Sequence, residues 1–74
     1  MDYRDRITAE PDVMLGKPIV KGTRITVELI LQKLSEGLAM EALLTSYPHL
    51  TKEDVLAALS YSVVVISREE MLPH

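Results

Sequence analysis

The chain contains no cysteine and only two histidines, His49 and His74, which lie far apart in the sequence. Neither a disulfide framework nor a Cys/His metal site is therefore available to stabilise the fold. At 74 residues the chain is one domain, and a domain of this size buries only a modest fraction of its surface. Self-association is the remaining way to supplement so small a core, so we expect a homodimer.

Long apolar runs are also absent. The longest apolar stretch, near residues 55–66, is interrupted by Ser60 and Ser62 and is too short to span a bilayer. The first residues, Met-Asp-Tyr-Arg-Asp-Arg, are polar and lack the apolar region of a signal peptide. We therefore expect a cytoplasmic protein without membrane contact.

The sequence offers little support for catalysis. Residues 16–18 are Gly-Lys-Pro, whereas a phosphate-binding P-loop needs Gly-Lys-Ser/Thr at the start of a helix. Tyr47, His49 and Asp54 lie close enough in sequence for acid–base chemistry, but no serine or cysteine stands in a recognisable nucleophile context. We expect no enzyme activity, no cofactor or metal, and no small-molecule substrate.

What the chain does have is a local excess of positive charge. Lys17, Lys21 and Arg24 are the only charged residues between Asp12 and Glu28, although the net charge of the chain is −3. An anionic partner such as nucleic acid is expected to meet the protein here. The alternative is that these three cations are solvated and keep the edge of a β-strand from pairing with other chains.

Prolines and glycines divide residues 1–25 into short pieces. The prolines of this segment exclude a long helix, and its glycines favour turns. We expect a small β-hairpin with arms at residues 18–21 and 23–25 and with Gly22 in its turn. Residues 7–8 are expected to add an edge strand.

The rest of the chain has the apolar spacing of three helices. Thr26 is a suitable N-cap for the first helix, and Gly37 is its expected left-handed terminator. A second helix is predicted over about residues 40–47, and Pro48 ends it because the residue before a proline disfavours helical backbone angles.

A capping box marks the start of the third helix. Thr51 is its N-cap, and Asp54 stands at the third helical position. The helix is predicted to continue to about residue 68, although the β-branched run at residues 63–66 also fits a strand. Apolar residues cover more than one face of this helix, so we expect a two-fold seam with a second copy. The residues assigned to this seam are Leu59, Tyr61, Val64 and Val65.

Three helices with short connections are typical of a helix-turn-helix protein. We therefore predict a mainly α fold: a three-helix, homeodomain-like helix-turn-helix bundle over residues 26–70, with a short N-terminal β-hairpin arm over residues 1–25. The third helix begins near Lys52, but Glu53 and Asp54 follow it, which disfavours contact between this helix end and DNA phosphates. Helix capping is the alternative explanation for the two carboxylates.

Several spaced segments carry a resemblance to a known family. They are Gly-Lys-Pro-Ile-Val-Lys-Gly-Thr-Arg-Ile at 16–25, Leu-Ser-Glu-Gly-Leu at 34–38, Tyr-Pro-His-Leu-Thr-Lys-Glu-Asp-Val at 47–55 and Ala-Ala-Leu-Ser-Tyr at 57–61. On these segments the chain resembles the domain-of-unknown-function family 433, the VapB-type antitoxin-like proteins of prokaryotes, from about Ile7 to Tyr61. Thr26 stands where the family commonly has proline, and its capping hydroxyl keeps the helix start.

The resemblance implies a homeodomain-like, DNA-binding antitoxin that neutralises a PIN-like ribonuclease toxin and represses their shared promoter. Met71 and Leu72 are the apolar residues of the short C-terminal segment and are the expected toxin contacts. A module that binds a partner protein without contacting DNA is the alternative function. The residues expected to contact nucleic acid are Lys17, Lys21, Thr23, Arg24 and Lys52.

Overall fold

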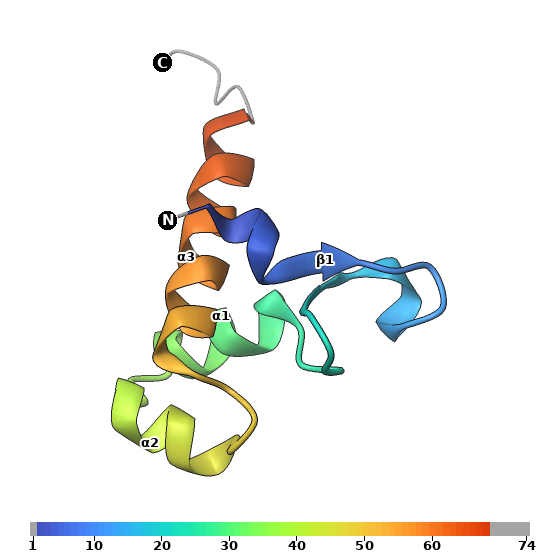
Figure 1. Cartoon of the computed structure of the whole chain (residues 1–74). Coiled ribbons are helices and arrows are strands. Elements are labelled where there is room, and N and C mark those ends of the chain that lie inside the picture. The colour runs from blue at the N-terminus through green and yellow to red at the C-terminus, as the bar shows by residue number, and fades with distance from the viewer. Residues whose placement is uncertain (1, 69–74) are drawn as a thin grey trace.

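The structure of the protein is a computed structural model that describes residues 2–68. This part of the chain is mainly helical, with three α-helices and a two-stranded antiparallel hairpin, as the sequence predicts (Figure 1). The elements in chain order are the 3-10 turn η1 (Tyr3–Asp5), strand β1 (Ile7–Ala9), the turn η2 (Met14–Gly16), strand β2 (Pro18–Val20), and the helices α1 (Val27–Ser35), α2 (Met40–Ser46) and α3 (Lys52–Arg68).

The hairpin is not the one expected from the sequence. β1 pairs antiparallel with β2 in the register that sets Ile7 opposite Val20, so the segment expected as an added edge is the pairing strand itself. The prediction of a strand at residues 23–25 is wrong. On that side of β2 the structure has an isolated bridge between Ile19 and Thr26 instead.

A tight turn takes the place of the expected second arm. The Thr23 hydroxyl donates a hydrogen bond to the Val20 carbonyl at 2.8 Å and accepts one from the Ile25 N–H at 3.0 Å. Gly22 has a φ of 76°, the left-handed conformation that glycine adopts without steric cost. Helix α1 begins at Val27, so too few residues remain for a strand.

Side chains cap α1 and α3 as the sequence predicts. The Thr26 hydroxyl accepts from the Leu29 N–H at 3.0 Å, and Gly37 has a φ of 93° just after α1 ends. At the start of α3, the Thr51 hydroxyl accepts from the Asp54 N–H at 3.1 Å, and the Asp54 carboxylate accepts from the Thr51 N–H at 3.0 Å. This reciprocal pair confirms the predicted capping box.

Helix α2 has less to hold it than the other two. It is 7 residues long, its N-cap residue Ala39 makes no side-chain capping bond, and Leu43 is its one buried residue. It ends at Ser46, just short of the predicted end at Tyr47, and Pro48 follows as the expected stop. Leu43 is its one fully buried anchor, and the partly buried Met40 and Leu44 add packing against the core.

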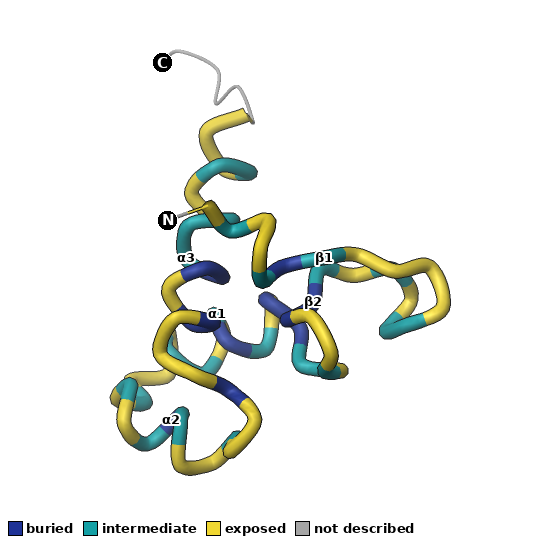
Figure 2. The backbone as a smooth tube through the Cα atoms, viewed as in Figure 1, coloured by how far each residue is buried: buried dark blue, intermediate teal, exposed yellow. Residues whose placement is uncertain are grey.

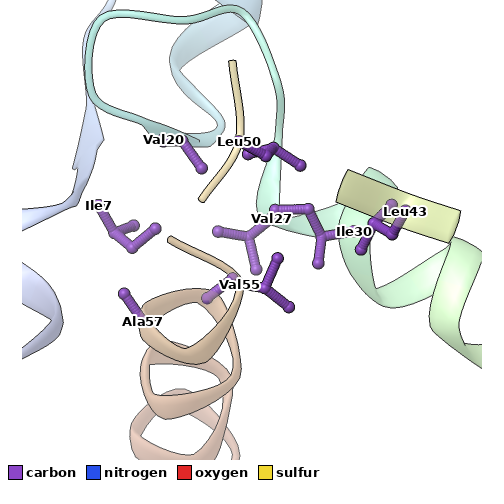
Figure 3. Packing of buried hydrophobic residues seen from close by; sticks show 9 residues of the cluster. Ile7, Val20, Val27, Ile30, Leu43, Leu50, Val55 and Ala57 are labelled. Carbon is purple, nitrogen blue, oxygen red and sulfur yellow. The ribbon is translucent and has the colours of Figure 1, made fainter. Parts of the chain in front are cut away.

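The hairpin and the helices share one hydrophobic core (Figure 3). Buried segments gather where the inner end of the hairpin meets α1 and α3, whereas the outer end of the hairpin is exposed (Figure 2). The inner end of the hairpin is thus part of the core that the helices build. The core residues are Ile7, Val20, Val27, Ile30, Leu43, Leu50, Val55, Ala57 and Ala58.

Helix α3 is helical through Arg68, which resolves the ambiguity over residues 63–66 in favour of helix. Its apolar surface exceeds what the core uses, as predicted: Leu56 is 39% exposed, and Val63 and Ile66 are each 62% exposed. Within residues 2–68, no helix has the length and apolar content needed to cross a membrane.

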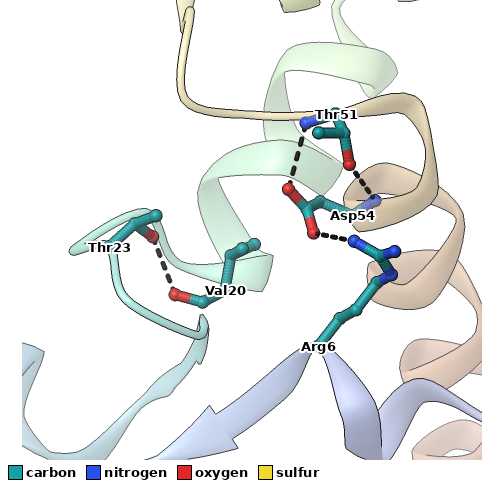
Figure 4. A network of polar contacts seen from close by, with 5 residues as sticks. All are labelled: Arg6, Val20, Thr23, Thr51 and Asp54. Carbon is teal, nitrogen blue, oxygen red and sulfur yellow. Dashed lines mark hydrogen bonds and ion pairs between the residues drawn. The ribbon is translucent and has the colours of Figure 1, made fainter.

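One ion pair joins the hairpin to α3. The Arg6 guanidinium lies 3.0 Å from the Asp54 carboxylate, although 48 positions separate the two residues (Figure 4). The Asp54 side chain is 10% exposed, and its other carboxylate oxygen accepts from the Thr51 N–H. The same group therefore caps α3 and holds the residue that precedes β1.

We expect Asp54→Ala to lower the free energy of unfolding by about 2 kcal/mol, because it removes a helix cap and leaves Arg6 without its partner. Urea denaturation measures this change. Glu53→Ala removes an exposed carboxylate from the same turn, and this control is expected to cost less than about 0.5 kcal/mol. Equal costs for the two variants would contradict the role assigned to Asp54.

Candidate nucleic-acid interface

The predicted cations gather around two adjoining hollows beside the hairpin. The first, which we call the turn hollow, has a volume of about 730 Å³ and is lined by Lys21 and Arg24 together with Glu10 and His49. Lys21 and Arg24 are exposed and stand on either side of the left-handed Gly22. The structure therefore brings two of the three predicted cations to one concave surface.

The second hollow, the loop hollow, lies against the β1–β2 loop. It has a volume of about 300 Å³ and is lined by Asp12, Met14, Leu15, Lys17 and Arg24. Because Arg24 lines both hollows, all three predicted cations lie along one continuous surface. Carboxylates also lie on this surface, which reduces its net positive charge.

The three cations differ in their partners. The Lys17 ammonium donates a hydrogen bond to the Glu28 carboxylate at 2.8 Å, and this bond, with the attraction between the two charges, holds the pKa of Glu28 below its ordinary value. Lys21 and Arg24 form no ion pair with any residue in the range 2–68. Their charges are thus available to a ligand in a way that the charge of Lys17 is not.

The backbone N–H groups of this turn are only partly used within the described residues. The Lys21 N–H donates to the Arg6 carbonyl at 2.8 Å, and the Thr23 N–H donates to the Val20 carbonyl at 3.0 Å. Over the described residues, no hydrogen bond uses the N–H groups of Gly22 or Arg24. N–H groups without an internal partner, beside cationic side chains, are donors from which a phosphate group can accept.

Thr23 and His49 have roles that the sequence did not indicate. Both hydrogen bonds of the Thr23 hydroxyl lie within the turn, so this predicted nucleic-acid contact also fixes the turn that carries Lys21 and Arg24. His49 was considered only for acid–base chemistry, and it reaches the turn hollow from the connection between α2 and α3. No local sequence signal relates His49 to the hairpin.

The remaining predicted nucleic-acid contact, Lys52, is exposed at the first residue of α3 and lines neither hollow.

The three residues considered for catalysis do not meet. Tyr47 lines a separate hollow with Lys33, and Asp54 is engaged by Arg6 and Thr51. Within residues 2–68, no group of three or more His, Cys, Asp or Glu side chains is placed to hold a metal ion.

The four residues assigned to a dimer seam are partly buried within the single chain. Leu59 and Tyr61 pack against the core, and the Tyr61 ring meets the Tyr3 ring in a T-shaped arrangement with centroids 5.2 Å apart. Val65 lines a mainly apolar groove between α1 and α3. Val64 is half-buried. The predicted toxin contacts, Met71 and Leu72, lie outside the described residues.

The β1–β2 loop contains two non-glycine residues in the left-handed region. Met14 has a φ of 49° and Leu15 a φ of 60°, and Gly16 continues the left-handed backbone with a φ of 78°. For a residue with a Cβ atom this conformation costs roughly 1–2 kcal/mol. Leu15 is 93% exposed, so burial of its side chain does not offset this cost.

These features define a class: a small three-helix protein whose N-terminal hairpin and following turn present a mixed but locally basic surface. The chain belongs to the family described as "Protein of unknown function (DUF433)", whose family model matches residues 7–62, and this confirms the resemblance seen in the sequence.

Two relatives are similar to the chain. It is 32% identical over 59 residues to "Uncharacterized protein y4eO" of Sinorhizobium fredii (strain NBRC 101917 / NGR234), a match that covers 80% of this chain and 27% of that protein. The crystal structure of a DUF433 member protein from Anabaena variabilis ATCC 29413 at 2.00 Å resolution superposes with a TM-score of 0.81 and 31% identity, covering 88% of this chain and 64% of that one. The chain therefore spans about a quarter of the first relative and under two thirds of the second.

We expect Leu15→Gly to raise the free energy of unfolding by about 0.5–1 kcal/mol and Tm by a few degrees. Glycine removes the left-handed strain, and the greater freedom of the unfolded chain offsets part of this gain. Thermal denaturation measures the change. Leu15→Ala keeps the Cβ atom and is the matched control, with an unchanged Tm. A lower Tm for the glycine variant would show that Leu15 stabilises the fold.

The Glu28 carboxyl group is expected to titrate below its ordinary range in an NMR titration, and Lys17→Met is expected to return its pKa toward that range. Because the folded pKa is the lower one, the stabilisation from the pair is present above the unfolded pKa and is lost as pH falls through the folded pKa. Lys21→Met is the control and leaves the titration of Glu28 unchanged. An unchanged pKa in Lys17→Met would rule out the hydrogen bond as the cause.

Proposed function

We propose that the chain is an antitoxin-like, homodimeric DNA-binding protein of the homeodomain-like helix-turn-helix type. It acts without catalysis in the cytoplasm, represses its own promoter and neutralises a PIN-like ribonuclease toxin. The observation that carries the DNA-binding part is the pair of exposed cations, Lys21 and Arg24, around a left-handed glycine beside an open hollow. The descriptions of the two relatives above state no function. The proposal therefore rests on this surface and on the family resemblance seen in the sequence.

The turn hollow suits a DNA phosphate better than it suits a neutral ligand. Lys21 and Arg24 supply two positive charges, and the N–H groups of Gly22 and Arg24 supply donors at the same turn. Phosphate oxygens accept from both kinds of group, and such contacts fix the register of a protein on the duplex. Lys17, held by Glu28, and Lys52, at the start of α3, are assigned supporting contacts.

Helices α2 and α3 and the five-residue connection between them, 47–51, support the helix-turn-helix assignment. The exposed first turn of α3 presents both Lys52 and Glu53, and Asp54 is occupied by its capping and ion-pair contacts. This mixture favours phosphate contacts at the hairpin side over base reading by the start of α3. A homodimer then has twice the positively charged surface of one copy, because each copy carries its own turn hollow.

A second candidate function is a protein-interaction module that does not contact DNA. Glu10 in the turn hollow and Asp12 in the loop hollow favour it, since carboxylates repel phosphates. The exposed Val63 and Ile66 of α3 favour it as well, because contiguous exposed apolar side chains mark protein contacts. In this alternative the toxin, or another partner protein, binds α3 and the C-terminal segment that contains Met71 and Leu72.

Salt dependence tests the DNA assignment. A duplex from the region upstream of the protein's own gene is titrated at several salt concentrations. The Lys21→Ala/Arg24→Ala double variant is expected to reduce the slope of log affinity against log salt by about two, roughly one per lost phosphate contact. The Arg4→Ala/Lys33→Ala double variant removes the same charge from positions outside both hollows and is expected to leave the slope unchanged.

Two results would reject the DNA assignment. One is the absence of binding by the wild-type protein at low salt. The other is an equal loss of slope in both double variants, which would trace binding to net charge rather than to the turn hollow. Binding of a PIN-like ribonuclease by a protein that does not bind DNA would then support the interaction module.

A further inference from the structure

Leu15 at the tip of the β1–β2 loop has a solvent-exposed side chain on a fixed backbone. Leu15 is 93% exposed, and the residues on both sides of it share its left-handed backbone. Two hydrogen bonds fix this conformation: the Gly16 N–H donates to the Val13 carbonyl at 3.0 Å, and the Lys17 N–H donates to the Met14 carbonyl at 3.1 Å. The exposed side chain is therefore presented by a defined turn.

Internal packing does not account for a leucine at this position. Glycine would adopt the same backbone conformation without strain, and Leu15 gives up almost no surface to the rest of the described chain in return. Strained residues that the fold does not need are concentrated at functional sites. The side chain of Leu15 is thus best explained by a contact outside the chain.

The surroundings of Leu15 indicate the kind of contact. Lys17 and Arg24 line the loop hollow with it, and Arg24 continues into the turn hollow assigned to phosphate. An apolar side chain between cations matches the wedge of minor-groove proteins, in which leucine or methionine enters between base pairs while cations hold the backbone. Met14, half-buried beside Leu15, supplies a second apolar surface at the base of the wedge.

We propose that Leu15 is a wedge that enters the minor groove of duplex DNA and partly unstacks one base step, with Arg24 on a flanking phosphate. This inference rests on the proposed DNA-binding function and adds a deformation of the duplex to it. The fixed turn lowers the entropic cost of inserting the side chain, because the wedge is already in its bound conformation. Asp12 is the one carboxylate that lines the loop hollow, and it opposes this binding.

The test uses the duplex from the upstream region with 2-aminopurine placed at successive base steps, because its fluorescence rises when the base unstacks. Wild-type protein is expected to raise the fluorescence at one step. Leu15→Gly is expected to abolish this rise and to weaken binding about tenfold with an unchanged salt slope, since no charge is lost. Leu15→Met keeps an apolar wedge and is expected to retain the rise.

Two further variants separate the wedge from general effects. Leu56→Ala removes an exposed leucine from α3 and is expected to change neither affinity nor fluorescence. Asp12→Asn removes the opposing carboxylate and is expected to strengthen DNA binding about twofold. Thermal denaturation of each variant establishes that a loss of binding is not a loss of fold.

The outcomes distinguish this inference from the function on which it rests. Wild-type affinity and unstacking in Leu15→Gly would overturn the wedge and leave the DNA assignment intact. No DNA binding by the wild-type protein would overturn both. If Leu15→Gly lost binding to a PIN-like ribonuclease while its DNA binding was unchanged, the wedge would be overturned and the loop tip would be a protein-docking element.

Discussion

One carboxylate, that of Asp54, sets how the hairpin and the helices are joined. It accepts the Thr51 N–H that would otherwise be unsatisfied at the start of α3, and it pairs with Arg6 just before β1. The core contacts of Ile7 and Val20 supply the apolar part of the same junction. Because the inner end of the hairpin is fixed in this way, its outer end is held at a defined place relative to α1 and to the connection that carries His49.

The two ends of the hairpin therefore serve different purposes. The inner end is buried and contributes to stability, whereas the loop and turn beyond it are exposed (Figure 2). The left-handed residues Met14 and Leu15 belong to the outer loop. The exposed cations Lys21 and Arg24 lie instead in the turn that follows β2, next to the inner end. The proposed interface is therefore made of two exposed segments on either side of β2, the loop before it and the turn after it, and not of the buried strand residues.

The helices were predictable because the signals that start and end them are local. The Thr26 cap and the Thr51–Asp54 capping box act within three residues. The pairing of β1 with β2 was not predictable, because β2 had two candidate partners and no local sequence signal decides between them. The same holds for the contact between Arg6 and Asp54, which depends on the completed fold.

The candidate site was predictable in part. The sequence brings Lys17, Lys21 and Arg24 together because they are close along the chain, but the pairing of Lys17 with Glu28 depends on where α1 lies relative to β2. The backbone conformation of Leu15 had no signal in the sequence, because leucine rarely adopts a positive φ.

Of the three α-helices, α2 is the shortest, has no side-chain cap at its N-terminus and has Leu43 as its one buried residue, so we expect it to open to solvent most readily. Its amides should exchange with solvent while those of α1 and the first half of α3 remain protected. Leu50, buried in the core beyond the end of α2, keeps the chain next to His49 attached during such an opening. We therefore expect local opening of α2 to leave the loop and the turn beside β2 in place.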